Sequence, residues 1–224
     1  MLQNYIFIFI IFLIIIYLVY YENIYQNFTC GYSNDFNDYI EPIIIDNFIT
    51  EQEAKYILDN TKDKFEDSTI IGGKNSSIRK SKNTWIKKDD NVVKNIFNRL
   101  LSFTQYPFEN AEDLQVVKYE PDGYYNEHHD SCCDETVECE EFIKRGGQRI
   151  LTVLIYLNDD YEGGSTRFHN LNKDYKPKKY SAVLFHPLNK SENKCHNNAL
   201  HSGMPIISGE KYIASIWIHE KTFI

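Results

Sequence analysis

An unbroken apolar stretch lies near the start of the chain, and polar and apolar positions alternate only after it. From Tyr5 to Tyr21 the chain reads YIFIFIIFLIIIYLVYY, without a charge, glycine or proline. At about 1.5 Å per residue this stretch spans roughly 25 Å as a helix, the short end of what crosses a bilayer. A cleaved signal peptide is the main alternative, but its usual basic start and small-residue cleavage site are missing. We therefore expect residues 1–21 to form an uncleaved transmembrane signal anchor.

A polar segment separates this stretch from the rest of the pattern. Residues 22–39 are polar with scattered aromatic residues and no clear period, which is typical of a stalk. The short apolar run from Pro42 to Asp46 then predicts a buried strand. We expect residues 40–224 to form one globular domain, because about 200 residues suffice for a core of their own.

Two amphipathic segments predict helices near the start of this domain. Thr50 and Glu53 have the spacing of a capping box, which opens a helix that runs to about Thr61. Apolar residues three or four positions apart from Val92 to Leu101 form one face of a second helix, which Asp89 or Asp90 can cap. The polar segment 66–82 between the helices is expected to be a loop or an irregular strand.

From residue 114 onward the pattern changes to short runs of β-branched and aromatic residues. The runs that predict strands are Leu114–Tyr119, Arg149–Leu157, Ser181–Phe185 and Tyr212–Ile218, and Thr84–Ile86 is a shorter extended piece. Glycine-containing turn signals separate these runs. Two helices followed by a series of strands predict an α+β fold whose β part is a sandwich or jelly roll.

The charge balance of the chain is acidic. It has 24 lysines and arginines against 32 aspartates and glutamates, a net charge of -8. An acidic surface repels phosphate backbones, so we do not expect nucleic acid as a partner. The sequence does not indicate an oligomeric state.

Cysteine use and glycosylation acceptors both favour the secretory pathway. The five cysteines are Cys30, Cys132, Cys133, Cys139 and Cys195. They allow up to two disulfides and one free thiol. Three of them, Cys132, Cys133 and Cys139, lie in one polar loop. Their spacing is not that of a zinc knuckle, so a disulfide that staples the loop is the better interpretation. The acceptor tripeptides begin at Asn27, Asn75 and Asn189.

The candidate chemistry lies in the β part of the chain. His128 and Asp130 point to the same face of an extended backbone, and His129 then points away. With His201 from another strand they supply the two imidazoles and one carboxylate of the facial triad that leaves positions open on Fe(II). Lys211 adds a fixed cation, which suits a dianionic co-substrate chelating the same metal. The other histidines are expected at the surface or in the core: His169, His186, His196 and His219.

Several motifs in the same order resemble the prolyl 4-hydroxylases, a family of Fe(II)/2-oxoglutarate-dependent dioxygenases. The resembling segments are 116–130, 146–157, 162–168, 200–205, 209–211 and 216–220. Together they extend over about residues 40 to 220. The resemblance implies a double-stranded β-helix, or jelly roll, with supporting N-terminal helices.

By position, the resemblance also implies roles for individual residues. His128, Asp130 and His201 would bind Fe(II). Lys211 would pair with the distal carboxylate of 2-oxoglutarate, and Tyr119 would donate a hydrogen bond to the same group.

Four further residues match positions around the pocket in relatives. Thr166 and Trp217 would line the 2-oxoglutarate pocket, and Tyr125 and Arg149 would face a peptide substrate. The alternatives are a strand residue for Thr166, core aromatics for Trp217 and Tyr119, and a surface ion pair for Arg149.

The implied reaction is the hydroxylation of peptidyl proline to 4-hydroxyproline with O2, coupled to the decarboxylation of 2-oxoglutarate to succinate and CO2. L-Ascorbate would keep the iron reduced. The expected substrate is a proline-rich or collagen-like polypeptide, met in the endoplasmic reticulum lumen or elsewhere in the secretory pathway by a single-pass membrane protein.

Departures from the prolyl hydroxylase pattern leave other functions open. The family's usual Gly-Gln is Asp122-Gly123 here, and its usual Thr-Val-Phe-Pro is Thr166-Arg167-Phe168-His169. Some motifs also resemble lysyl hydroxylases, which generally use arginine where this chain has Lys211. A small-molecule hydroxylase, a catalytically silent membrane-anchored binding module and a zinc hydrolase are further alternatives. A zinc hydrolase would need a general base, which this sequence does not offer at the site, and Lys211 would have no role in it.

Overall fold

The computed structural model describes residues 32–33, 35–70 and 75–224. The expected anchor at residues 1–21, the acceptor Asn27 and Cys30 lie outside the described residues. Among those that are described, no helix has the length and apolar character needed to cross a membrane.

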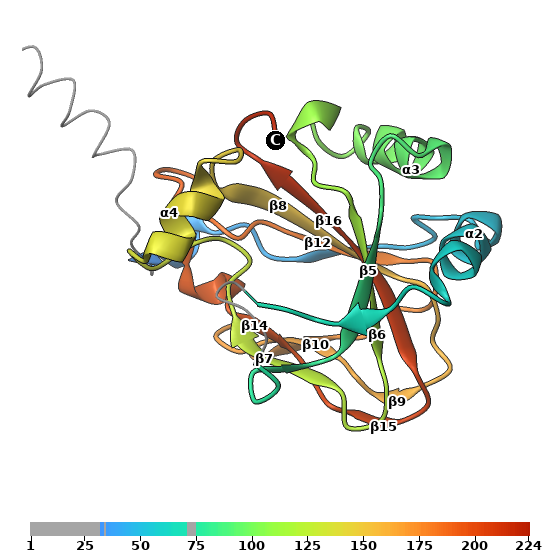
Figure 1. The fold of residues 1–224 in the computed structure, drawn as a ribbon. Helices are drawn as coiled ribbons and strands as arrows, with labels where there is room; N and C mark the ends of the chain where they lie inside the picture. The colour runs from blue at the N-terminus through green and yellow to red at the C-terminus, as the bar shows by residue number, and fades with distance from the viewer. Residues whose placement is uncertain (1–31, 34, 71–74) are drawn as a thin grey trace, which may run out of the picture.

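Two antiparallel sheets face each other and form the body of the domain (Figure 1). The seven-stranded sheet has the order β2 (Ile43–Ile45), β12 (Ala182–Phe185), β8 (Arg149–Tyr156), β16 (Lys211–His219), β6 (Leu114–Tyr119), β5 (Lys82–Ile86) and β3 (Glu66–Asp67). The five-stranded sheet has the order β11 (Lys173–Tyr175), β10 (Thr166–Phe168), β14 (His201–Gly203), β7 (Tyr124–His128) and β4 (Arg79–Lys80). β9 (Glu162–Gly163) pairs with β15 (Ile206–Ser208) at one end. This arrangement confirms the predicted jelly roll.

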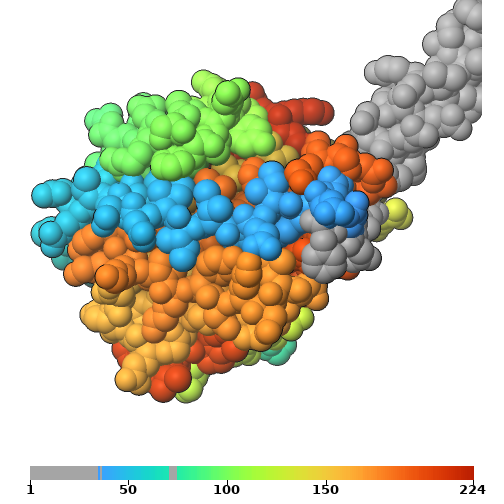
Figure 2. Space-filling view, turned by 180° about the vertical axis from the view of Figure 1, so that it is seen from behind, coloured from blue at the N-terminus to red at the C-terminus, as the bar shows by residue number. Residues whose placement is uncertain are grey.

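Two helices, α2 (Glu51–Thr61) and α3 (Asn91–Leu100), cover the outer face of the large sheet (Figure 1). The predicted capping box is present, because Thr50 accepts from the Glu53 amide while the Glu53 carboxylate accepts from the Thr50 amide. Asp90 caps α3. Seen from behind, the chain around β2 forms a band between the α3 region and the segment that leads to β12 (Figure 2).

The core has two parts, one on each face of the large sheet. One lies under α2 and α3 and contains buried residues such as Ile57, Ile96 and Leu151. The other lies between the two sheets and includes Tyr156 and Phe168. Because the central strands β8 and β16 are covered on both faces, their apolar runs are nearly continuous, as expected of a buried strand.

The structure adds elements that the sequence pattern did not predict. A short helix, α4 (Val137–Ile143), follows the cysteine-rich loop, and Thr136 caps it by accepting from the Cys139 amide. The polar segment 66–82, expected to be a loop or an irregular strand, contains β3 and β4 and leads into β5. β3 pairs with β5, β4 with β7 and β5 with β6. β4 and β5 therefore depend on partners more than 25 residues further along the chain.

The described part of the expected stalk lies against the domain. β1 (Tyr32–Ser33) pairs in parallel with β13 (Cys195–His196), and η1 (Phe36–Asp38) follows it. Tyr39 is buried and stacks on His196, with ring centroids 4.6 Å apart.

The predicted loop staple is confirmed. Cys132 bonds to Cys139 at the start of α4, and Cys133 bonds to Cys195 in β13.

The two acceptor asparagines within the described residues differ in exposure. Asn75 is exposed, and its glycosylation stays a prediction. The Asn189 amide is buried and donates to the Asp38 carboxylate and the Ser191 hydroxyl. A glycan on Asn189 would require its side chain to leave this packing, and its glycosylation also stays a prediction.

Candidate metal centre and co-substrate pocket

The three predicted metal ligands meet between two neighbouring strands. His128 ends β7 and is the register partner of His201, which begins β14. Asp130 follows two residues after His128. One ligand atom from each of the three residues lies within 4.8 Å of the others. The Nε2 atoms of His128 and His201 lie 3.7 and 3.9 Å from the Asp130 carboxylate oxygens.

Both imidazoles are oriented by backbone carbonyls. The Nδ1 atom of His128 lies 2.7 Å from the Asn126 carbonyl, and that of His201 lies 2.9 Å from the Ala199 carbonyl. A donating Nδ1–H leaves the Nε2 lone pair facing the shared space, which is how outer contacts fix metal-binding histidines. The donor set and its orientation therefore fit a divalent metal such as Fe(II).

The electrostatics hold two of the ligands, His128 and Asp130, in the protonation states that bind metal. Burial and the neighbouring His201 lower the pKa of His128 well below its usual value. Burial alone would raise the pKa of Asp130, but the charges of His201 and His128 outweigh it and lower that pKa to about 2. At neutral pH the pocket thus presents a carboxylate and a neutral imidazole from these two residues.

Thr152 supports the carboxylate from the large sheet. Its hydroxyl donates to the Asp130 carboxylate at 2.8 Å. We expect Thr152→Val to weaken Fe(II) or Co(II) binding by about 10- to 100-fold, the usual range for an outer-shell partner. Metal titration of the purified variant checks this, and Thr152→Ser should retain most of the affinity because it keeps the hydroxyl. Unchanged affinity in the valine variant would contradict the assignment.

The loop after Asp130 is tied down by several contacts. The Ser131 hydroxyl donates to the Arg149 carbonyl at 2.6 Å, and the Cys132 backbone exchanges two hydrogen bonds with the Gln148 side chain. The next residue forms the bridge Cys133–Cys195 to the segment that leads into β14. This disulfide joins the stretch that carries two ligands to the stretch that carries the third.

Removing the bridge Cys133–Cys195 by a double alanine substitution should therefore lower both stability and metal affinity. The bridge closes a separation of 62 residues, against 7 for Cys132–Cys139. The chain-entropy argument then gives a loss of about 4 kcal/mol, compared with about 2 kcal/mol for the shorter loop. Denaturant unfolding and metal titration of the two double variants, compared side by side, measure the difference. Equal effects would show that the long bridge has no special part in holding the triad.

A buried lysine lies beyond the triad in a cavity of about 40 Å³. Lys211 begins β16, and its ammonium donates to the Gly164 carbonyl at 2.7 Å. It lies 5.6 and 5.0 Å from the ring centres of Tyr119 and Tyr156. The salt bridges of the described residues give Lys211 no carboxylate partner. Burial, with a smaller contribution from Lys176, lowers its pKa to about 7. A buried cation without a counter-ion fits an anionic co-substrate.

The predicted neighbours of this lysine are present, and one further residue joins them. Tyr119, Thr166 and Trp217 line the same cavity as Lys211 and the triad. The further residue is Tyr156, whose hydroxyl lies 2.7 Å from the Thr166 hydroxyl. Tyr156 was not among the site residues predicted from the sequence. Alternation along β8 could have found it, because Thr152, Leu154 and Tyr156 share one face of the strand.

A second cavity, of about 520 Å³, opens beside the triad and forms a groove. It is lined by Asp130 of the triad and by Tyr125, Trp85, Trp217 and Arg149. The Tyr125 ring stacks on His128, with centroids 3.5 Å apart. The family resemblance implies that Tyr125 and Arg149 face a peptide substrate. Both border this groove, and their contact with a substrate stays a prediction.

Arg149 is held in place by a buried acid. Its Nε donates to the Glu112 carboxylate at 2.6 Å, and its guanidinium lies 3.9 Å from the Trp217 ring centre. Burial would raise the pKa of Glu112, but the Arg149 charge and the hydrogen bond from His219 outweigh it and lower that pKa to about 2. Arg149 is therefore in an ion pair, as the alternative held, but a largely buried one.

Arg79 in β4 is a groove residue that no sequence signal indicated. Its guanidinium lies 4.6 Å from the ring centre of Tyr125, and it borders both the small cavity and the groove. It lies in the polar segment without periodicity, so only the pairing of β4 with β7 places it here.

A jelly roll with a two-histidine, one-aspartate centre and a buried lysine behind it defines the class of non-haem Fe(II) oxygenases that use 2-oxoglutarate. The sequence profile of the 2OG-Fe(II) oxygenase superfamily matches residues 114–219. The chain belongs to the prolyl 4-hydroxylase family within that superfamily and is a dioxygenase. Membership implies Fe(II), 2-oxoglutarate and O2.

Individual relatives show the extent of the similarity. A protein named "Putative prolyl 4-hydroxylase" from Acanthamoeba polyphaga mimivirus is 48% identical over 193 residues, covering 86% of this chain and 80% of the relative. Prolyl 4-hydroxylase 5 of Arabidopsis thaliana is 32% identical over 206 residues, covering 81% and 69%. The 2OG complex of the viral collagen prolyl hydroxylase from Paramecium Bursaria Chlorella virus-1 superposes with a TM-score of 0.62 at 29% identity, covering 80% and 94%.

Proposed function

We propose that this enzyme hydroxylates peptidyl proline to 4-hydroxyproline, with decarboxylation of 2-oxoglutarate to succinate and CO2. The observation that carries the proposal is the buried, unpaired ammonium of Lys211 in the same cavity as the His128, Asp130 and His201 triad. A metal triad alone suits many reactions. A triad with a fixed cation behind it suits a dicarboxylate that binds metal at one end and lysine at the other.

The triad, Lys211, Tyr119 and Thr166 each have a distinct part in this proposal. The triad holds Fe(II), which when bound supplies the oxidative chemistry with O2. Lys211 binds the distal carboxylate of 2-oxoglutarate, while Tyr119 and the hydroxyl of Thr166 offer it hydrogen bonds. The aromatic walls exclude water.

The groove beside the triad suits a proline-rich peptide. Aromatic-lined grooves bind extended polyproline segments, which have little conformational entropy to lose. Tyr125, Trp85 and Trp217 supply such walls, and Arg149 can donate to peptide carbonyls from the groove. The names of the prolyl hydroxylase relatives support proline as the target, and the viral collagen prolyl hydroxylase supports a collagen-like chain.

Two further parts of the proposal come from the sequence. L-Ascorbate would restore iron oxidised in uncoupled turnover. The segment 1–21 would anchor the domain in the membrane facing the secretory lumen, where the two disulfides of the described residues are stable.

The test is an incubation of the full chain with Fe(II), 2-oxoglutarate, ascorbate and a proline-repeat peptide. A gain of one oxygen per modified residue, located on proline by fragmentation, is the expected result, with stoichiometric succinate. Peptides with lysine in place of proline serve as the comparison. Succinate release stimulated by the lysine peptides alone would reject proline as the target.

A further inference from the structure

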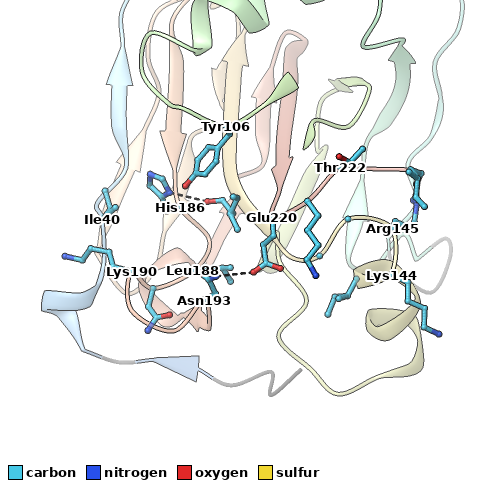
Figure 3. A pocket seen from close by; sticks show the side chains of 17 residues that line it. Ile40, Tyr106, Lys144, Arg145, His186, Leu188, Lys190, Asn193, Glu220 and Thr222 are labelled. Atoms are coloured by element: carbon cyan, nitrogen blue, oxygen red, sulfur yellow. Dashed lines mark hydrogen bonds between the residues drawn. The ribbon is translucent and has the colours of Figure 1, made fainter. Parts of the chain in front are cut away.

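A wide, open cleft of about 880 Å³ lies at the end of the domain near α4 (Figure 3). Tyr106 and His186 form its inner wall. Lys190 and Asn193 lie on one side and Lys144 on the other, with the C-terminal segment between them. None of the triad or co-substrate residues lines this cleft.

The rim of the cleft is basic, although the chain as a whole carries a net charge of -8. Four cations line it: Lys144, Arg145, Lys190 and Lys221. The only acidic side chain among its lining residues is that of Glu220. Both oxygens of that carboxylate already accept hydrogen bonds, one from the Gln148 backbone amide at 3.0 Å and the other from the Asn193 side-chain amide at 3.2 Å. The cleft therefore concentrates positive charge.

Three of these cations have little or no competing internal anion. Lys221 makes no ion pair with any described carboxylate, and Lys190 is near Asp38 without a direct bridge. Lys144 bridges to Glu141, but both side chains are more than 60% exposed, so the pair is worth little. None of the three is held by a buried internal ion pair, so each can bind an external acid.

A chain of stacked groups connects the cleft to the iron-site groove. Arg149 lies 4.8 Å from the ring centre of Phe142, and the Phe142 and His219 centroids are 5.4 Å apart. His219 stacks on Phe223 at 4.5 Å, and the Arg145 guanidinium lies 4.4 Å from the Phe223 ring. Arg145 borders both the groove and the cleft. The two recesses are thus neighbours.

We propose that this cleft binds acidic residues on one flank of the peptide substrate, a few residues from the target proline. The inference rests on the proposed peptidyl hydroxylation and names the class of peptide that it prefers. The cations are spread around an open rim on flexible stems, which suits several separated carboxylates better than one compact anion. Arg145 borders both recesses, and an extended polyproline segment advances about 3.1 Å per residue, so an acidic flank on the same peptide extends from the groove toward the cleft.

The test uses three peptides that share one proline-containing core. One carries glutamates on its N-terminal flank, one carries them on its C-terminal flank, and one carries glutamines on both. The variant Lys144→Gln/Lys190→Gln/Lys221→Gln removes cleft charge. The matched control, Lys62→Gln/Lys64→Gln/Lys94→Gln, removes the same charge from exposed positions in and next to α2 and α3.

For the wild type we expect a KM about tenfold lower or more for one of the two acidic peptides than for the glutamine peptide, with similar kcat. The cleft variant should lose this preference, and the control variant should keep it. Anisotropy of the labelled acidic peptides, measured without O2, gives the same comparison without turnover. Equal binding of all three peptides, or a preference that survives in the cleft variant, would overturn the inference.

The two proposals fail in different ways. If the core peptide is hydroxylated and the flanks have no effect, only the cleft assignment is wrong. If no proline is hydroxylated but one acidic peptide still binds through the cleft lysines, the proposed reaction is wrong and the cleft assignment stands.

Discussion

Replacement of His201 by alanine is expected to abolish both 2-oxoglutarate turnover and peptide hydroxylation. The side chain is 3% exposed, and its Nε2 atom faces the Asp130 carboxylate across the triad. Without it, two ligands remain for a metal that needs three protein donors to stay fixed while its other positions react. We expect metal affinity to fall by more than about 100-fold, since loss of an outer-shell partner alone costs up to that factor.

Metal titration followed by a succinate assay separates the two parts of this prediction. His186→Ala is the control, because His186 is half-buried, contacts the Ile150 carbonyl and lies outside the triad. It should bind metal like the wild type. A wild-type chain that turns over no 2-oxoglutarate, with a His201→Ala variant of unaltered properties, would instead favour a catalytically silent binding module.

The parts of this fold that the sequence predicted are those with local causes. The capping box of Thr50 and Glu53 and the apolar face of α3 depend on residues within a few positions, so their pattern suffices. The strands β3 and β4 have no such pattern. They are polar because each is short and lies at or near a sheet edge, and only their pairing with β5 and β7 makes them strands.

The same distinction holds within the site. The spacing of His128 and Asp130 gives a shared face on any extended backbone. The assignment of His201 as the third ligand, by contrast, was supported by the family resemblance. The partner of Arg149 could not be predicted, because Glu112 lies 37 residues away and only the assembled fold brings the two to 2.6 Å. Tyr156 was hidden for another reason: a tyrosine in an apolar run has the pattern of a core residue, and here it is also a hydrogen-bond partner of Thr166.

Replacement of Lys211 by methionine is expected to weaken 2-oxoglutarate binding by at least about 100-fold, because an anion would be left buried without its counter-ion. The KM for 2-oxoglutarate should rise while metal affinity stays near that of the wild type, since Lys211 is not a ligand. Lys176→Met, which removes a nearby exposed lysine, is the control and should change the KM little. A wild-type KM in the Lys211 variant would remove the main support for the co-substrate pocket.

The same variant should be more stable than the wild type when 2-oxoglutarate is absent. Burial lowers the pKa of Lys211 from 10.5 to about 7 in the folded chain, so folding at pH 7 costs roughly 4 kcal/mol through this group. Between pH 7 and 10.5 the unfolded chain binds the extra proton, and this cost is relieved as pH rises. Methionine removes it at every pH.

The pH dependence of 2-oxoglutarate binding has the opposite sign, because the dicarboxylate binds the ammonium form. Below pH 7 the amine of Lys211 is already protonated, so its contribution to affinity is constant there. Above pH 7 binding must take up a proton, and affinity should fall by up to about tenfold per unit. Calorimetry of the Mn(II)-loaded protein in two buffers of different ionisation enthalpy measures that proton uptake. An affinity that is constant from pH 7 to 9 would show that the lysine stays charged without its anion. The structure would then have to stabilise the free ammonium with more than the Gly164 carbonyl and two tyrosine rings.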